Sequence, residues 1–283
     1  MSFMLHVERR PRTPHSDAVT AGTPLTVATT LPMVCLHGWG MNLRVFDLLR
    51  DALAAERETL AVDLAGHGAS AWAAGHAQFD TQMEDVLAVL PPRCVLLGWS
   101  FGGKLALALA ARHPARIAAL VLVSATPKFA QSADWPHGLD ADSMQAFRAV
   151  LEQDWQQTLS DFVWLQLRGS RNAEAAQRVL EAALAQQGKP HPEALRNGLD
   201  LLHTLDLRAH AVEVMQPTLV ISGQNDRVTP PGAARWLAAA LPQAQLVEVP
   251  RAGHAPFVSH HQEVAAAVRV FLAATAATAA TRA

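Results

Sequence analysis

Residues 93–114, RCVLLGWSFGGKLALALAARHP, carry the strongest structural signal in this chain. Their first half is a continuous apolar run, which predicts a strand buried on both faces, and their second half has the pattern of a helix that ends at Pro114. Between the two, residues 98–103 (GWSFGG) match the motif G-x-S-x-G, in which a serine stands at a sharp turn between a strand and a helix. Glycine tolerates the crowding at such a turn, so we expect Ser100 to be a nucleophile at its apex.

Apolar strands and amphipathic helices alternate on both sides of this stretch. Continuous apolar strands of this kind predict a parallel sheet with helices on both faces. Because crossovers between parallel strands are right-handed, the prediction is a doubly wound α/β architecture. The predicted strands lie within residues 31–38, 59–70, 93–100, 115–125, 216–226 and 244–254, and the predicted helices span 43–56, 79–90, 101–114, 232–241 and 261–274.

The pattern changes between residues 128 and 205, where no strand is predicted. The third of four helical stretches in this segment carries one apolar stripe, formed by Ala176, Val179, Leu180, Ala183 and Leu184. Helices inserted between strands of one sheet predict a helical cap at 128–205, over a core made of residues 29–127 and 206–274. The four predicted cap helices are 143–153, 154–169, 171–187 and 191–205.

The two ends of the chain carry weaker patterns. We expect residues 1–28 to form a partly mobile N-terminal arm that holds at most a short edge strand, and residues 275–283 to form a frayed low-complexity tail without chemistry. Charges and prolines interrupt the first 17 residues, which argues against a signal peptide. No apolar run reaches the roughly 18 residues that a membrane-spanning helix needs.

Composition excludes several classes of protein. Half of the 283 residues are hydrophobic and 17% are charged, so the chain can bury a large core and is not disordered. The 23 lysines and arginines nearly balance the 25 aspartates and glutamates, so no overall positive field attracts nucleic acid or an anionic membrane. Cys35 and Cys94 lie in apolar runs and are expected to be buried free thiols. We expect a cytoplasmic monomer.

A serine hydroxyl is a weak nucleophile and needs a base that an acid orients. Asp226 ends the strand segment 216–226, and His254 ends the next one, 244–254. The carboxyl ends of parallel strands meet at one edge of a sheet, and the chain order serine, aspartate, histidine is that of the α/β-hydrolases. We therefore expect Ser100, Asp226 and His254 to form a catalytic triad.

Two neighbouring loops need a separate interpretation. Asp63 also follows a strand, but its loop continues as Gly66-His67-Gly68, so we expect Asp63 to fix that loop rather than to serve as the acid. The loop His37-Gly38-Trp39-Gly40 follows the first strong strand, where hydrolases of this kind present a backbone N–H to the oxyanion. The expected oxyanion donors are the N–H groups of Trp39 and Phe101, and the histidine at position 37 is expected to orient its loop.

No cofactor motif accompanies these residues. No Cys/His cluster has the spacing of a metal site, and neither the phosphate-binding motif G-x-x-x-x-G-K-[ST] nor a dinucleotide-binding fingerprint occurs. The sequence therefore predicts ester chemistry without a metal or a cofactor.

Three motifs together with the cap resemble the pimeloyl-[acyl-carrier protein] methyl ester esterases of biotin synthesis. The serine motif alone is shared by many hydrolases, whereas the combination is much more specific. The resemblance extends over residues 31–272. The matching segments are 37–42 (HGWGMN), 98–103 (GWSFGG), 254–260 (HAPFVSH) and, in the cap, 161–166 (DFVWLQ) and 197–202 (NGLDLL).

The resemblance implies that a methyl group is removed from a pimeloyl chain carried on acyl carrier protein. It also implies the same triad and oxyanion donors, with Trp39 lying along the substrate. Phe162 of the cap would line the acyl channel, although packing between cap and core explains this residue equally well.

In the resembled family, cap arginines contact the acidic carrier protein, and this feature recurs only in part. Arg168, Arg171 and Arg178 could form such a patch, because Arg171 and Arg178 are spaced to share a helix face. Glu174 and Glu181 flank them, as on an ordinary solvated helix.

Three other functions stay open at this point. A broad short-chain carboxylesterase would share every catalytic residue and differ only in the esters that it accepts. A carbon–carbon bond hydrolase of ring-cleavage products uses a similar triad and would be recognised by cleavage of vinylogous diketones. A non-catalytic binding protein of the same fold is a different class, and an intact triad argues against it.

Overall fold

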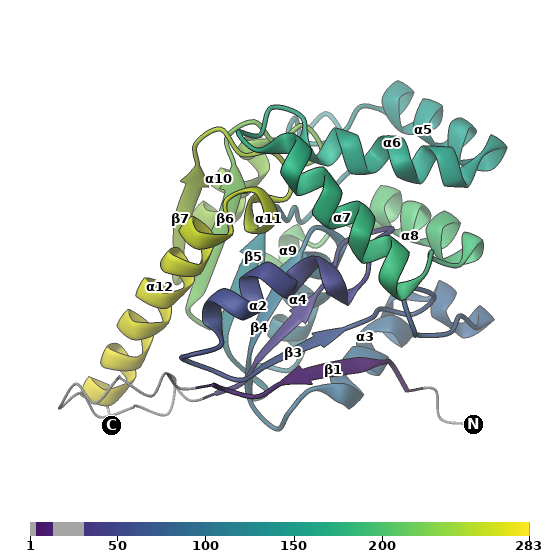
Figure 1. The fold of residues 1–283 in the computed structure, drawn as a ribbon. Coiled ribbons are helices and arrows are strands. Elements are labelled where there is room, and N and C mark those ends of the chain that lie inside the picture. The colour runs from purple at the N-terminus through teal and green to yellow at the C-terminus, as the bar shows by residue number, and fades with distance from the viewer. Residues whose placement is uncertain (1–3, 14–30, 283) are drawn as a thin grey trace.

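The computed structural model describes residues 4–13 and 31–282 (Figure 1). Its centre is a seven-stranded sheet with the strand order β1-β3-β2-β4-β5-β6-β7. Strand β1 (Val7–Arg10) pairs antiparallel with β3, and all other neighbours are parallel. This mostly parallel sheet confirms the predicted architecture, and β1 is the short edge strand expected in the N-terminal arm. The parallel strands are β2 (Met33–Leu36), β3 (Thr59–Val62), β4 (Cys94–Trp99), β5 (Ile117–Val123), β6 (Thr218–Gly223) and β7 (Ala244–Val249).

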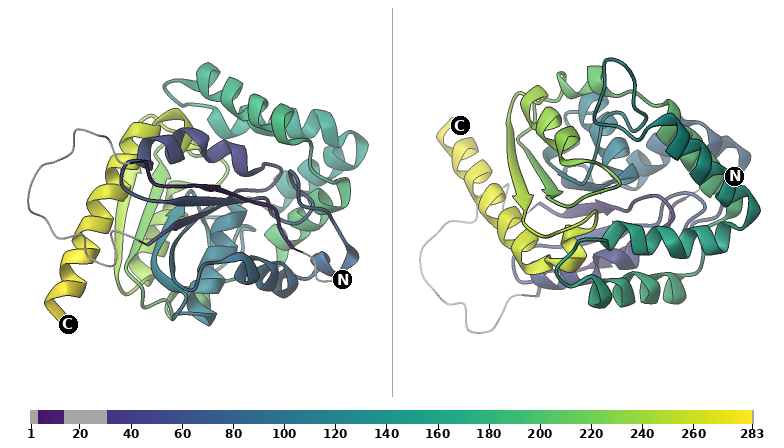
Figure 2. Two further views of the ribbon diagram at one scale, coloured as in Figure 1. Left: turned by 60° about the horizontal axis from the view of Figure 1, so that its bottom comes forward. Right: turned by 90° about the horizontal axis from the view of Figure 1, so that it is seen from above.

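Helices cover both faces of the sheet (Figure 2). Helices α2 (Asp47–Leu53) and α12 (His261–Arg282) pack together on one face, while α3 (Phe79–Val89) and α4 (Phe101–Arg112) pack together on the other. All six residues of β4 and ten of the twelve residues of α4 are buried, which explains why residues 94–111 are mostly apolar. The remaining short elements of the core are η1 (Leu43–Phe46), η2 (Ala74–Ala77), α9 (Arg208–Ala211), α10 (Pro231–Ala240) and α11 (Pro256–Ser259).

All four predicted cap helices are present, and they lie over one end of the sheet (Figure 1). Asp140 caps the N-terminus of the first cap helix and Asp154 that of the second. Each aspartate side chain accepts hydrogen bonds from backbone N–H groups in the first turn of its helix. In the third, Ala176, Leu180 and Ala183 of the predicted apolar stripe are buried. The cap helices are α5 (Ala141–Gln153), α6 (Trp155–Leu167), α7 (Ala173–Gln187) and α8 (Pro192–Thr204).

The chain enters and leaves the cap through two segments that lie side by side. Lys128 and Asp206 form a β-bridge between them, and the N–H of Leu207 donates to the carbonyl oxygen of Pro127 at 2.9 Å. Lys104 of α4 ties both segments to the core, since its Nζ lies 2.9 Å from that same oxygen and 3.3 Å from the carbonyl oxygen of Leu205. Burial lowers the pKa of Lys104 to about 7, although Asp206 opposes this shift.

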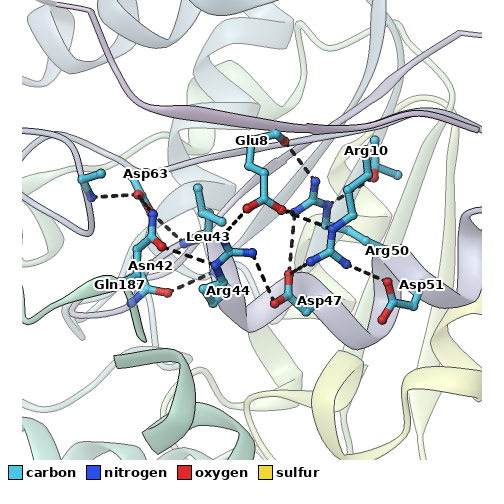
Figure 3. A network of polar contacts seen from close by, with 12 residues as sticks. Glu8, Arg10, Asn42, Leu43, Arg44, Asp47, Arg50, Asp51, Asp63 and Gln187 are labelled. Atoms are coloured by element: carbon cyan, nitrogen blue, oxygen red, sulfur yellow. Dashed lines mark hydrogen bonds and ion pairs between the residues drawn. The ribbon is translucent and has the colours of Figure 1, made fainter. Parts of the chain in front are cut away.

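Polar contacts anchor β1 to the helix that follows β2 (Figure 3). Glu8 forms ion pairs with Arg44 and with Arg50, whose guanidinium is buried. From Arg44 the contacts continue to Gln187 of α7 and then to Asp63, which accepts from the Gln187 amide at 3.0 Å. The edge strand, the core loops and the cap are therefore connected through one chain of polar groups.

The C-terminal helix is longer than predicted. Helix α12 continues to Arg282 instead of ending at residue 274, because alanine dominates the expected tail and has the highest intrinsic helix propensity. No helix within residues 4–13 and 31–282 is both long and apolar enough to cross a bilayer. Cys35 and Cys94 are buried free thiols, as predicted.

Candidate active site

Ser100 lies between β4 and α4 in a strained backbone conformation. Its φ of 54° and ψ of −114° cost a residue other than glycine roughly 1–3 kcal/mol. The turn can form only because its neighbours lack side chains. A Cβ on Gly98 would lie 2.4 Å from the carbonyl oxygen of Gly102, and one on Gly102 would lie 2.3 Å from that of Leu36. The glycines of the G-x-S-x-G motif thus allow the serine to reach the cavity beneath the cap.

Asp226 and His254 meet at the same edge of the sheet, after β6 and β7. His254 Nδ1 lies 2.9 Å from Asp226 Oδ2, and both side chains are buried. Asp226 Oδ1 accepts the backbone N–H groups of Val228 and Thr229, each at 2.9 Å. These bonds hold the carboxylate in place, with Oδ2 facing Nδ1 of His254.

The sequence reasoning did not identify Thr229 as part of this arrangement. Its hydroxyl oxygen lies 2.8 Å from Asp226 Oδ2, 3.3 Å from His254 Nδ1 and 3.1 Å from the carbonyl oxygen of Ser124. Aspartate side chains often close turns by accepting backbone N–H groups a few residues on, so the residues just after Asp226 could have been examined as its partners.

The second nitrogen of His254 is available. His254 Nε2 is buried and has no hydrogen-bond partner in the described part of the chain, and this includes Ser100. A buried polar atom without a partner costs about 1–3 kcal/mol, so Nε2 favours any group that can bond to it. Hydrogen bonds of catalytic groups are often long in the absence of substrate and shorten when substrate binds. The structure therefore pairs His254 with Asp226 and brings Ser100 to the same edge, without a bond between Ser100 and His254.

The loop 37–40 lies directly against the serine. A Cβ on Gly38 would be only 3.1 Å from Ser100 Cβ. Phe101 is the first residue of α4, so its N–H has no acceptor within its own helix. Among the described residues, no acceptor takes the backbone N–H of Trp39 or of Phe101. Both predicted oxyanion donors are thus free beside Ser100.

Two buried imidazoles hold this loop. His37 Nε2 accepts the N–H of Leu64 at 3.0 Å, and His67 Nε2 accepts the N–H of Gly40 at 3.3 Å. Burial lowers the pKa of His37 to about 4 and that of His67 to about 3, so both rings are neutral at pH 7 and can accept these bonds. The prediction that His37 orients its loop is confirmed.

Asp63 fixes the neighbouring loop, as predicted. Its Oδ1 accepts the N–H of Leu43 at 2.8 Å, and its Oδ2 accepts the N–H of Ala69 at 2.9 Å. The backbone of this loop also approaches the carboxylate so closely that any side chain at Gly68 would collide with it. No hydrogen bond joins Asp63 to His254 in the part of the chain that the structure describes.

An apolar cavity opens between Ser100 and the cap. Phe162 lines the cavity and also packs edge-on against Trp39, with 5.1 Å between ring centroids, so its position is compatible both with a role in the acyl channel and with packing between cap and core. The cap helices contribute Met144, Phe147, Phe162, Leu165, Leu199 and Leu202 to the wall.

The three candidate docking arginines lie at the surface near the turn between α6 and α7. Arg168, Arg171 and Arg178 are exposed, and none of them pairs with an acidic side chain within the described ranges. The prediction that Arg171 and Arg178 share a helix face is wrong, because Arg171 precedes the first residue of α7. Arg171 and Arg178 line one surface hollow. Arg171 also lines a second hollow together with Arg251.

No group of three His, Cys, Asp or Glu side chains is arranged to hold a metal ion within residues 4–13 and 31–282.

Known proteins resemble this chain in sequence and in fold. A family model described as alpha/beta hydrolase fold matches residues 32–261. The pimeloyl-[acyl-carrier protein] methyl ester esterase of Nitrosomonas europaea is 41% identical over 231 residues, which cover 82% of this chain and 91% of that protein. The esterase of the same name from Chromobacterium violaceum is 39% identical over 233 residues, or 82% of this chain and 90% of that protein.

Solved structures agree on the fold. An esterase from Exiguobacterium antarcticum superposes with a TM-score of 0.81 at 22% identity, with 95% of each chain covered. A bromoperoxidase from Bacillus anthracis gives a TM-score of 0.80 at 21% identity with the same coverage. These likenesses show the fold alone, whereas the sequence identity to the esterases extends through the cap. The chain therefore belongs to the α/β-hydrolase family and, within it, to the pimeloyl-[acyl-carrier protein] methyl ester esterases.

Proposed function

We propose that this protein hydrolyses the methyl ester of pimeloyl-[acyl-carrier protein] through an acyl-enzyme on Ser100. One observation carries the proposal: His254, held by Asp226, keeps a buried and unpaired Nε2 at the edge of the sheet where Ser100 opens into an apolar cavity. A base, its orienting acid and a nucleophile with free oxyanion donors are the parts that acyl transfer requires. The relatives named above carry the name of that esterase.

In the proposed mechanism, His254 Nε2 takes the proton of Ser100 as its Oγ attacks the ester carbonyl. Asp226 holds the imidazole tautomer and stabilises the imidazolium, and the N–H groups of Trp39 and Phe101 donate to the oxyanion. His254 then returns the proton to the departing methoxide, which leaves as methanol. Water activated by the same nitrogen hydrolyses the acyl-enzyme and frees Ser100.

The cavity supports an acyl chain of several carbons as the substrate. Its cap walls are apolar, and each methylene group that they bury contributes about 0.8 kcal/mol of binding free energy. Trp39 and Phe162, in edge-to-face contact, form part of this wall. A pimeloyl ester should therefore bind better than an acetyl ester.

The surface arginines support an acidic protein as the carrier of that chain. Arg168, Arg171 and Arg178 have no acidic partner among the described residues, so their charges are available to another molecule. Arg251 adds a fourth charge next to Arg171, because the N–H of Arg171 donates to the carbonyl oxygen of Arg251 at 2.8 Å. We call residues 168, 171, 178 and 251 the arginine patch.

Two further parts of the proposal concern the state of the protein in the cell. Buried, unpaired Cys35 and Cys94 fit the reducing environment of the cytoplasm. We expect a monomer there, and sedimentation velocity on the purified protein tests this expectation.

The decisive experiment is incubation with pimeloyl-carrier methyl ester beside p-nitrophenyl esters of graded acyl length. Intact-mass spectrometry of the carrier should show the loss of one CH₂ unit with the native protein and none with Ser100→Ala. Hydrolysis of the p-nitrophenyl esters without any change in the carrier would contradict the proposal and favour a broad short-chain carboxylesterase.

A further inference from the structure

Arg227 is a charged residue in the lining of an otherwise apolar cavity. Ten of the twelve residues that line the cavity are apolar, and the other two are Ser100 and Arg227. Ser100 is accounted for as the proposed nucleophile. Apolar walls give a guanidinium no partner, so the presence of Arg227 there needs a different explanation.

The residue beside Arg227 offers no free acceptor for its guanidinium. Asp226 is the nearest carboxylate in the sequence, but both of its oxygens are occupied. Oδ1 accepts two backbone N–H groups, and Oδ2 is bonded by Thr229 and His254. A carboxylate offers about four acceptor positions, so none is left for a guanidinium.

No other side chain in the described part of the chain pairs with Arg227. Arg227 is exposed and forms neither a hydrogen bond nor an ion pair with any residue within 4–13 and 31–282. Other arginines of the core are engaged: Arg50 pairs with Glu8, and Arg208 pairs with Asp134 and Asp206. The five donors of Arg227 are therefore free at the wall of the cavity that Ser100 also lines.

A free guanidinium in such a place has a specific chemical preference. Its planar fork matches the two oxygens of a carboxylate or a phosphate, and such bidentate bonds are the stronger ones among charged pairs. Arg227 is exposed, but the apolar walls beside it lower the local dielectric and so strengthen the attraction to an anion bound in the cavity. A neutral ester or a plain alkyl chain offers no comparable partner.

We propose that Arg227 is a specificity-determining residue that binds an anionic group on the substrate, at a distance along the chain from the reacting ester. This inference rests on the proposed esterase function and adds the substrate class: esters that carry an anionic group beyond the reacting ester, either on the acyl chain or on the arm that carries it. The anion has two possible sources with the same chemistry. One is the free carboxylate of a dicarboxylic acid half ester, and the other is the phosphodiester in the prosthetic arm of a carrier protein.

The test compares pairs of substrates that differ only in charge. The kcat/KM is measured for the monomethyl and the dimethyl ester of pimelic acid at pH 7.5, and for the carrier-bound methyl ester. The variant Arg227→Met keeps an apolar stem and removes the charge, and Arg227→Lys keeps the charge but loses the fork. Arg93→Met, an exposed arginine just before β4 at the opposite end of the sheet, is the matched control.

If the carboxylate is the bound anion, Arg227→Met should lower the ratio of kcat/KM for the half ester to that for the diester at least tenfold. Arg227→Lys should lower it less, and Arg93→Met should leave it within twofold. If the phosphodiester of the arm is the bound anion, Arg227→Met should lower kcat/KM for the carrier-bound ester at least tenfold relative to kcat/KM for the diester. The ratio of kcat/KM for the half ester to that for the diester should then stay unchanged.

Equal changes for all three substrates in Arg227→Met would overturn the proposal. Failure of the proposed function is a different outcome: the native protein would then cleave no methyl ester. In that case the same ratios can be measured with p-nitrophenyl half esters and neutral p-nitrophenyl esters of equal length. These substrates test Arg227 independently of the methyl leaving group.

Discussion

The two sides of the cavity are built by opposite means. Below it, the loops at the edge of the sheet are held by buried polar groups, such as His37, His67, Asp63 and Asp226, nearly all of them hydrogen-bonded. Above it, the cap presents apolar and aromatic side chains that only pack against one another. The comparison teaches that the lower side determines which reaction is possible, whereas the upper side determines which chain fits.

The loops below the cavity and the cap above it should differ in how well they tolerate substitutions. Removal of one partner from a buried hydrogen bond costs about 1–3 kcal/mol and leaves the other group unsatisfied. Apolar walls respond gradually, because each methylene group buried against them contributes only about 0.8 kcal/mol. Changes on the lower side should therefore abolish turnover or folding, and changes in the cap should shift preference.

The largest effect is expected for the carboxylate that holds His254. Asp226→Asn should lower kcat on a p-nitrophenyl ester by roughly 10⁴-fold, since an amide favours the wrong imidazole tautomer. The melting temperature should stay within a few degrees of the native value. Asp63→Asn is the matched variant and should lower the melting temperature while kcat falls far less. The opposite pattern would assign the acid to Asp63.

The second effect concerns stability in acid. The folded-state pKa values of His37 and His67, about 4 and about 3, lie below the unfolded value of 6.5, so the unfolded state binds more protons as pH falls below 6.5. Stability is thus full above pH 6.5 and lost as pH falls, by roughly 1.4 kcal/mol per pH unit for each ring. Urea unfolding between pH 7 and pH 5 measures this slope.

Single substitutions attribute that slope to the two rings. His37→Gln or His67→Gln should each reduce the slope of unfolding free energy against pH by about 1.4 kcal/mol per pH unit, which corresponds to one proton. His203→Gln, on the exposed side of α8, should leave this slope unchanged. An unaltered slope in both buried variants would show that these rings do not hold the loop in their neutral form.

The third effect is smaller and concerns Thr229. Thr229→Val keeps the shape but removes the hydroxyl beside Asp226 and His254, so kcat should fall roughly 10- to 100-fold, as expected for a bond of about 1.5–3 kcal/mol to a charged group. Thr229→Ser should restore most of the lost kcat. Loss of activity in both variants, with normal melting temperatures, would assign the effect to packing of the methyl group.

The fourth effect tests the cap. Phe162→Ala should lower the ratio of kcat/KM for a seven-carbon ester to that for an acetyl ester by roughly tenfold, because part of the chain's apolar wall is lost. Steady-state kinetics on p-nitrophenyl esters of graded length provides the ratio. A uniform loss at every chain length would place Phe162 in cap packing alone.

The smallest effect is expected from the arginine patch. Arg171→Glu combined with Arg178→Glu should raise KM for the carrier-bound ester roughly five- to tenfold relative to a small methyl ester, since exposed ion pairs contribute only about 0.2–1 kcal/mol each. Arg93→Glu combined with Arg12→Glu is the control far from the patch. Equal changes in KM for both esters would remove the patch from carrier recognition.

The comparison also explains what could be predicted from the sequence. The strands, the serine turn and the cap helices follow from local patterns of apolar residues and glycines, and all of them are present. Asp63 and His37 were assigned to loops correctly, because their positions after strands and next to glycines are local signals too.

The features that sequence reasoning missed depend on distances between separate segments. The contact of Thr229 with His254, the ion pairs of Glu8 and the free donors of Arg227 arise only when strands far apart in the chain come together. The position of Arg171 outside α7 depended on where the helix begins, and residue spacing alone does not determine this. The absence of a bond between Ser100 and His254 likewise depends on the relative placement of two loops.

The most direct test of the central claim is to identify the acylated residue during turnover. Native protein is mixed with monomethyl pimelate, quenched in acid within milliseconds and digested for peptide mass spectrometry. We predict a pimeloyl group on the peptide that contains Ser100, and no adduct in Ser100→Ala. Continued hydrolysis by Ser100→Ala, or an adduct on another residue, would contradict the account.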